Sequence, residues 1–247
     1  MTRHARTTML TLLCLTAPLA ACGEDHTEGV APATVAPSTP TTPTTPTAEA
    51  ATTPEATPTS AAGTAAPSAD HAPADTVPLP IARDRSTLGF TAAKVTASHD
   101  GSFGEWSGTI DLARSGDPTA SRVSVSIVMD SLVIEPARLA GHLRTPDLLD
   151  VAQFPTATFR STQIAAGATG QIGGAAATHT VMGDFTLHGQ TRTITFPAII
   201  TVSDSEVSAR AEFSINRQDF GITYPGMPDD LIRDAVVIRF DIHAPRT

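Results

Sequence analysis

Most of the chain beyond residue 79 alternates between apolar and polar positions with a period of two. The alternating stretches are 88–92, 106–112, 123–129, 157–159, 181–187, 194–202, 207–215 and 236–242. This period is typical of antiparallel strands that bury one face. Gly189 and the sequence 203–205 mark turns between neighbouring stretches. Eight such strands predict a mainly β fold, either a closed up-and-down barrel or a sandwich.

One region departs from the alternation. Residues 135–143 space their apolar side chains for a helix, and Pro136 suits a first helical turn. Thr145-Pro146-Asp147 has the form of a second helix start, with a cap, a proline and an acid in order. We expect two short helical pieces over one mouth of the barrel.

The N-terminal sequence predicts an export signal. Arg3 and Arg6 precede an apolar run from Met9 to Ala21, which is too short to span a bilayer. The run ends in Leu19-Ala20-Ala21-Cys22, which resembles a bacterial lipobox. We therefore expect residues 1–21 to be a lipoprotein signal peptide and Cys22 to be the lipidated residue. An ordinary export signal with an incidental cysteine is the alternative.

Composition divides the rest of the chain into two parts. Residues 22–78 are rich in proline, threonine and alanine and contain no aromatic residue, so we expect a disordered tether. Residues 79–247 are expected to form the folded domain. Cys14 and Cys22 are the two cysteines of the chain, which leaves none for a disulfide within that domain.

The acidic net charge of the chain argues against some classes of binding partner. Loss of residues 1–21 would remove two of the 16 basic residues and none of the 25 acidic ones. A chain this acidic argues against nucleic acid and against docking on anionic lipid through a basic patch. Membrane contact then depends on the lipid anchor, and several acyl chains would hold the protein firmly.

An eight-stranded barrel can be filled by its own side chains or can enclose one small ligand. The inward positions here include many small residues, which leave room if larger neighbours do not fill it. These are Gly108, Gly183, Ala92, Ala157, Ala198, Ala209 and Ala211. An apolar cavity without polar partners accepts hydrocarbon. The residues that we expect to line it are Phe90, Trp106, Ile110, Val125, Ile127, Leu139, His142, Leu143, Phe159, Phe185, Phe196 and Phe213.

Five ordered motifs carry a family resemblance. They are 95–110, 141–150, 154–162, 183–191 and 216–221. In this order and spacing they resemble the YceI-like family of bacterial envelope proteins. The resemblance implies a lipocalin-like barrel that holds a long isoprenoid chain inside. Together with the alternating stretches and the helical region, it leads us to expect an eight-stranded antiparallel lipocalin-like β-barrel with a short helical segment over one end. Leu148-Leu149 replaces the usual pair of phenylalanines, and residues 134–138 are unlike the common pattern.

Three functions remain open from the sequence. The first is an envelope-anchored lipoprotein that carries an isoprenoid-type lipid such as a polyprenol or quinone. The second is an enzyme that acts on such a lipid through His142 and a neighbouring acid, Asp147 or Asp150. The third is a solid barrel that serves as an envelope stress or interaction module without a small ligand.

The carrier is the function that we expect, without enzymatic activity. The sequence has no nucleophile elbow, no His-Glu-x-x-His and no phosphate loop. No metal site or cofactor is expected, because the histidine spacing resembles no known site. The expected location is the cell envelope, on an outer membrane and facing the periplasm or the surface. The sequence leaves a homodimer open.

Overall fold

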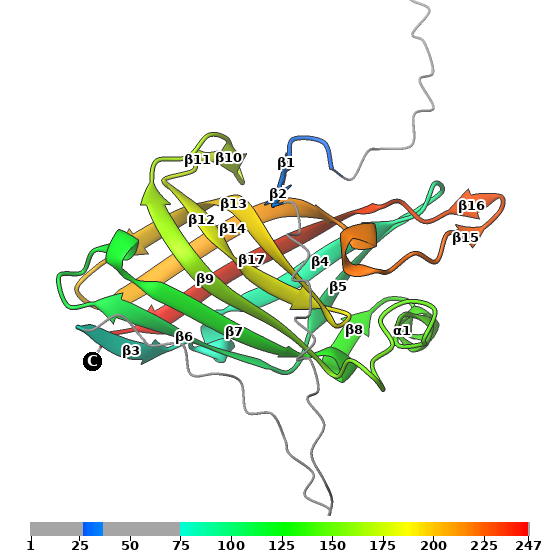
Figure 1. The fold of residues 1–247 in the computed structure, drawn as a ribbon, viewed down its shortest axis with the longest axis horizontal. Helices are drawn as coiled ribbons and strands as arrows, with labels where there is room; N and C mark the ends of the chain where they lie inside the picture. Colours follow the sequence, from blue (N-terminus) through cyan, green and yellow to red (C-terminus); the bar gives the residue numbers. More distant parts are fainter. Residues whose placement is uncertain (1–26, 37–74, 247) are drawn as a thin grey trace, which may run out of the picture.

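The computed structural model describes residues 27–36 and 75–246 and consists mainly of one strongly curled antiparallel sheet (Figure 1). Eleven strands follow one another along its path, in the order β3-β6-β7-β9-β12-β13-β14-β17-β4-β5-β8. Their bounds are Thr76–Pro80 (β3), Thr87–Ala93 (β4), Ser98–Phe103 (β5), Trp106–Ala113 (β6), Arg122–Val128 (β7), Leu132–Ile134 (β8), Thr156–Ala166 (β9), His179–Leu187 (β12), Gln190–Val202 (β13), Glu206–Asn216 (β14) and Ala235–Pro245 (β17).

Residues that follow β3 help to close the curled sheet. The Ile81 amide donates to the Gly108 carbonyl of β6 over 3.0 Å, and the Ala82 amide donates to the His243 carbonyl of β17 over 2.8 Å. Strands from distant parts of the path are thereby joined. The sheet is barrel-like, with strongly tilted strands around a common interior (Figure 1).

All eight alternating stretches are strands, with their apolar positions directed inward. The expected strand count of eight is wrong, because the sheet contains thirteen strands when β1, Ala31–Pro32, and β2, Thr34–Val35, are included. β5 was missed because it reads Ser-His-Asp-Gly-Ser-Phe, and β8 because it has only three residues. Two small hairpins add β10 with β11, Gln171–Ile172 with Ala175–Ala176, and β15 with β16, Gly226–Met227 with Asp230–Leu231.

Helical structure is limited. α1 spans Ala137–Leu143 at one end of the barrel, as expected, with Pro136 at its N-cap position. The expected second helix at 145–147 is a series of turns instead, in which the amides of Leu148 and Asp150 both donate to the Thr145 carbonyl, over 3.1 and 2.9 Å. Short 3₁₀ turns lie at Arg83–Arg85 (η1), Pro118–Ala120 (η2), Met129–Ser131 (η3) and Arg217–Phe220 (η4). Within the described ranges, no helix combines the length and apolar character needed to cross a bilayer.

The stretch expected to be a disordered tether includes ordered residues. β1 and β2 lie on the barrel, and β3 begins at Thr76, three residues before the expected domain boundary. For these residues the expectation of disorder fails, because their backbones pair with strands of the domain. The expected signal peptide, Cys22 and residues 37–74 lie outside the described residues.

The inward side chains form two apolar clusters. One joins Trp106, Ile110 and Ile127 with β3 and the end of β17, and the other joins Ile194, Phe196 and Phe213 with the end of β9 and η4. Phe185, Leu187 and Phe240 pack against both clusters. The interior is therefore continuous from one group of strands to the other.

Candidate functional site: an apolar barrel cavity

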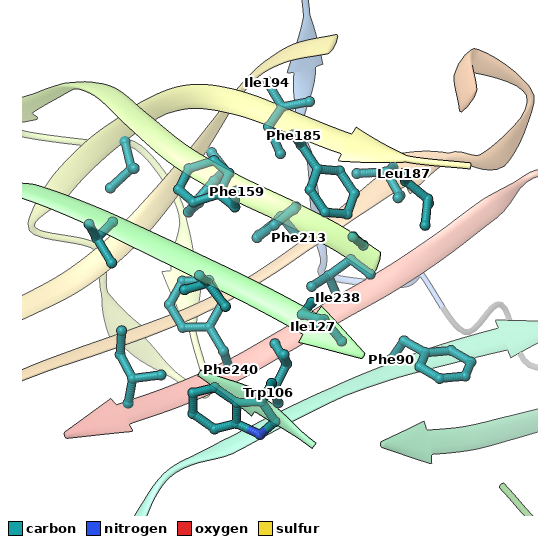
Figure 2. Close-up of a pocket in the computed structure, with 18 of the residues that line it drawn as sticks. Phe90, Trp106, Ile127, Phe159, Phe185, Leu187, Ile194, Phe213, Ile238 and Phe240 are labelled. Carbon is teal, nitrogen blue, oxygen red and sulfur yellow. The ribbon is translucent and has the colours of Figure 1, made fainter. Parts of the chain in front are cut away.

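The interior of the curled sheet contains a cavity of about 240 Å³. Apolar side chains from β4, β6, β7, β9, β12, β13, β14 and β17 line it, and Figure 2 shows Phe90, Phe159 and Phe240 among them. Nearly all of the exposed lining is carbon; Ser121, Arg122 and Arg217 are the lining residues with polar side chains. This volume is just below the roughly 300–1,000 Å³ typical of ligand pockets. The interior is thus not a solid core.

Ten of the twelve expected lining residues border the cavity. They are Phe90, Trp106, Ile110, Val125, Ile127, Leu143, Phe159, Phe185, Phe196 and Phe213. The alternation of the strands placed nine of them, because residues two apart in a strand share a face, and the tenth, Leu143, lies on α1. Their positions agree with the expected inward faces of all the strands concerned.

Leu139 and His142 are not among the lining residues, so their placement in the cavity is wrong. Both lie on α1, and of this helix Leu143 alone borders the cavity. His142 is exposed, and its ring meets Tyr224 edge-on with centroids 5.7 Å apart. The chain after α1 folds back through a hydrogen bond from the Leu149 amide to the Leu143 carbonyl, which places Leu148 and Leu149 in the lining.

Small inward residues create room at only some positions. Ala92, Ala157, Ala198 and Ala209 border the cavity. The two glycines do not contribute in this way: a Cβ on Gly108 would lie 2.6 Å from Ile81 Cδ1, and one on Gly183 would lie 2.5 Å from Phe159 Cζ. Neighbouring side chains already fill the space above these glycines.

Four phenylalanine rings meet inside the barrel. Phe196 stacks on Phe213 with centroids 4.1 Å apart, and Phe159 and Phe240 contact Phe196 at 5.6 and 6.0 Å. Phe240 was recognised as inward-facing but was not among the expected ligand contacts, nor was Ile238, which also lines the cavity. Both continue the alternation of β17, so the sequence pattern was sufficient to predict that they face the cavity.

Arg217 organises one end of the cavity and was not expected to do so. Its side chain is buried; Nη1 donates to the Ile222 carbonyl over 2.6 Å, and Nη2 donates to Asp234 Oδ1 over 2.9 Å. Nε donates to the Arg233 carbonyl over 3.2 Å. The guanidinium thereby fixes the chain that carries Ile222 and Ile232, which both line the cavity. The nitrogen atoms of this guanidinium therefore form their hydrogen bonds with groups of the protein itself.

Charged groups with shifted pKa values lie outside the cavity lining. The amide and hydroxyl of Thr119 donate to Asp117 and lower the pKa of its carboxyl. Partial burial lowers the pKa of His179, at the start of β12. Lys94 and Thr96 donate to Asp230 and lower the pKa of that carboxyl. These interactions hold turns and hairpins in place.

Two further histidines, His99 and His188, contact backbone carbonyls of the protein. His99 Nδ1 lies 3.0 Å from the Glu135 carbonyl, and His188 Nδ1 lies 3.1 Å from the Phe220 carbonyl. No group of three or more potential metal ligands occurs among residues 27–36 and 75–246. The arrangement of the cavity therefore offers shape and hydrocarbon contact, and His142 lies outside its lining.

Comparisons with known proteins agree with this geometry. A protein from Pseudomonas savastanoi pv. phaseolicola, described as a UPF0312 protein, is 35% identical over 132 residues, which are 51% of this chain and 65% of that protein. The match thus spans just under two thirds of the relative. A Yersinia enterocolitica UPF0312 protein is 31% identical over 50% of this chain and 62% of its own.

Solved structures share the fold at low sequence identity. BcnA from Burkholderia cenocepacia superposes with a TM-score of 0.56 at 20% identity, over 66% of this chain and 99% of BcnA. A domain from Saccharophagus degradans, described as a polyisoprenoid binding domain, gives 0.53 at 15% identity, over 70% of this chain and 100% of that domain. The model of the YceI-like domain matches residues 80–244, which include every strand from β4 to β16 and nearly all of β17. The curled sheet, its apolar interior and this match together place the chain in the YceI-like family.

Proposed function

We propose that this protein binds a long apolar lipid of the isoprenoid type inside its barrel and carries it in the bacterial envelope. The observation that supports this most is an interior cavity with an almost wholly apolar lining. Such a hollow offers little to a polar metabolite, because its polar groups would lose water without gaining partners. A hydrocarbon chain loses nothing of this kind.

The size of the cavity also favours a narrow, flexible ligand. Burial of apolar surface is worth about 25 cal/mol per Å², or about 0.8 kcal/mol per CH₂ group. A chain of modest length would therefore bind usefully after its ordering cost. The similar Saccharophagus degradans fold, described as polyisoprenoid binding, makes isoprenoid lipids the class to test first.

Lipid extraction from the full chain purified from its native envelope tests this proposal. We expect an isoprenoid lipid in near-stoichiometric amount by mass spectrometry. Ala209→Phe would fill the cavity from β14 and should abolish retention of the lipid, while Arg210→Phe places the same ring outside the barrel on the next residue and should retain it. Absence of any co-purifying isoprenoid, with no uptake of added polyprenol, would refute the proposal.

We further propose that Cys22 anchors the protein to the membrane. The lipobox-like sequence before it supports this, and the acidic net charge of the chain argues against attachment through a basic patch. Cys22→Ser should move the protein from the membrane fraction to the soluble fraction, because no acyl chains would remain. Unchanged fractionation of this variant would contradict the anchor.

A further inference from the structure

The wall of the barrel contains a gap between two neighbouring strands. β13 and β14 pair directly only where Ile199–Val202 meets Val207–Arg210. Beyond that point, residues 190–198 keep their pairing with β12, and residues 211–216 keep theirs with β17. The edges of β13 and β14 that face each other there are not paired to one another. We call the boundary between these two strands the seam; it is closed by direct pairing in one half and open in the other.

A short segment of the chain's own N-terminal region occupies this gap. We call residues 31–35 the strap. Its β2 pairs antiparallel with β13, with Val35 opposite Ile194, and its β1 pairs parallel with β14, with Ala31 opposite Phe213. Around these pairs, the Ala33 amide donates to the Ser214 carbonyl over 2.8 Å, and the Ala36 amide donates to the Thr193 carbonyl over 3.0 Å. The strap thus serves as an additional strand of the wall.

The strap has an inner and an outer face. Ala33 and Val35 are half-buried and pack against the apolar cluster that contains Ile194 and Phe213, both of which line the cavity. Pro32 and Thr34, which alternate with them, are exposed. Removal of the strap would therefore expose cavity-lining side chains through the wall.

Elements of the family domain border the cavity elsewhere. Leu148 and Leu149 border it at the end where α1 lies, together with the chain that Arg217 holds. Pro118 and Ser121 border it around η2. The strap differs from these elements because it is held by two short pairings and small side chains, and it lies outside residues 80–244 of the family domain. Segments with so few buried contacts are the ones that open locally.

We propose that the gap between β13 and β14 is a lateral entrance for lipid and that the strap is the removable strand that closes it. This inference rests on the proposed function, because an entrance requires a cargo. When the strap leaves and the stacked rings of Phe196 and Phe213 move apart, a chain-like lipid can pass sideways between the two strands into the cavity. When the strap returns, it restores the backbone hydrogen bonds and encloses the lipid.

The test compares two neighbouring positions on the strap in the full chain. Val35→Asp places a carboxylate against the apolar cluster and should release the strap, because an unpaired charge is costly to bury. Thr34→Asp adds the same charge on the exposed face and should leave the strap in place. Amide hydrogen exchange at Ala33 and Ala36 measures the release directly, without any lipid.

Uptake of a fluorescent polyprenol by the delipidated protein then measures the entrance. A minor open form is populated at about 0.1–10%, so full release should accelerate uptake by about 10- to 1,000-fold. Thr34→Asp should take up the probe at the rate of the original chain. Both variants should bind it to the same final stoichiometry.

Each other outcome has a distinct meaning. Released amides with an unchanged uptake rate would overturn the entrance and leave the lipid-binding function standing. Failure of every form to bind the probe, at any rate, would overturn the lipid-binding function and the entrance with it. Amides that stay protected even in the double variant A33D/V35D would show that the strap is a permanent part of the wall, which also overturns the proposal.

Discussion

The two halves of the seam between β13 and β14 differ although their sequences alternate alike. In the closed half, Ile199–Val202 bonds directly to Val207–Arg210. In the open half, the strands part and the strap enters between them. The difference shows that alternation fixes which side chains face inward but not which backbones pair. Register across a seam is a property of the assembled barrel.

The largest expected effect concerns two arginines, one within β14 and one just beyond its end. Arg217, beyond the open half, is buried and bonds to three carbonyls and Asp234, whereas Arg210, in the closed half, is exposed and pairs with Asp241. Arg217→Ala should lower the free energy of unfolding by about 3 kcal/mol, because several buried carbonyls lose their donor. Arg210→Ala should cost less than about 1 kcal/mol. Urea denaturation measures both, and equal losses would show that the open half is no more dependent on its arginine.

An intermediate effect comes from two alanines on the inner face of β14. Ala211, in the open half, is fully packed, whereas Ala209, in the closed half, borders the cavity. Ala211→Leu should cost about 2 kcal/mol through overpacking. Ala209→Leu has free space beside it and should change the free energy of unfolding by less than about 0.5 kcal/mol. Thermal denaturation of the pair checks this, and a reversed order would mean that the cavity lies elsewhere.

The smallest effects are dependences of stability on pH, and they differ between the two regions. Asp230 lies on the hairpin beyond the open half, and its pKa is lowered from 3.8, chiefly by the hydrogen bond from Lys94. Its contribution to stability is therefore complete above pH 3.8 and is lost as the pH falls through the lower folded value. Lys94→Gln should flatten this acid-side loss.

His179 lies opposite Ala198, next to the closed half, and burial lowers its pKa from 6.5. Below pH 6.5 the unfolded chain binds more protons at this histidine than the folded chain does. Stability should therefore fall as the pH drops from that value towards the folded pKa, and His179→Gln should remove this slope. Free energies of unfolding measured across the acid range separate the pH range in which Asp230 affects stability from the range in which His179 does. A slope unchanged by either substitution would assign it to other groups.

Local periodicity was sufficient to predict the inner surface of the barrel. Phe196 and Phe213, on different strands, were both expected inside, and they stack there. The side chains of α1 that face the cavity were harder to predict. The rotation of this helix about its axis depends on how the following turn folds back. Leu143 was placed correctly, while His142 was not.

Amino-acid composition gave a wrong prediction for two segments whose sequences resemble a linker. β3 reads Thr-Val-Pro-Leu-Pro, and proline argues against a central strand. β3 lies at one end of the strand order, where its prolines are tolerated, with Leu79 buried. The strap, Ala-Pro-Ala-Thr-Val, has the same composition as its surroundings. Only the unpaired edges of β13 and β14 give it a partner, and these edges are invisible in the sequence.

The strap would also determine how far the barrel can lie from the proposed membrane anchor. With Cys22 anchored as proposed, nine residues reach Ala31, which allows at most about 30 Å when the strap is docked. Once it detaches, the chain from Cys22 to Thr76 allows up to about 180 Å. Docking of the strap would then control both the distance between the barrel and the membrane and the opening of the lateral entrance between β13 and β14.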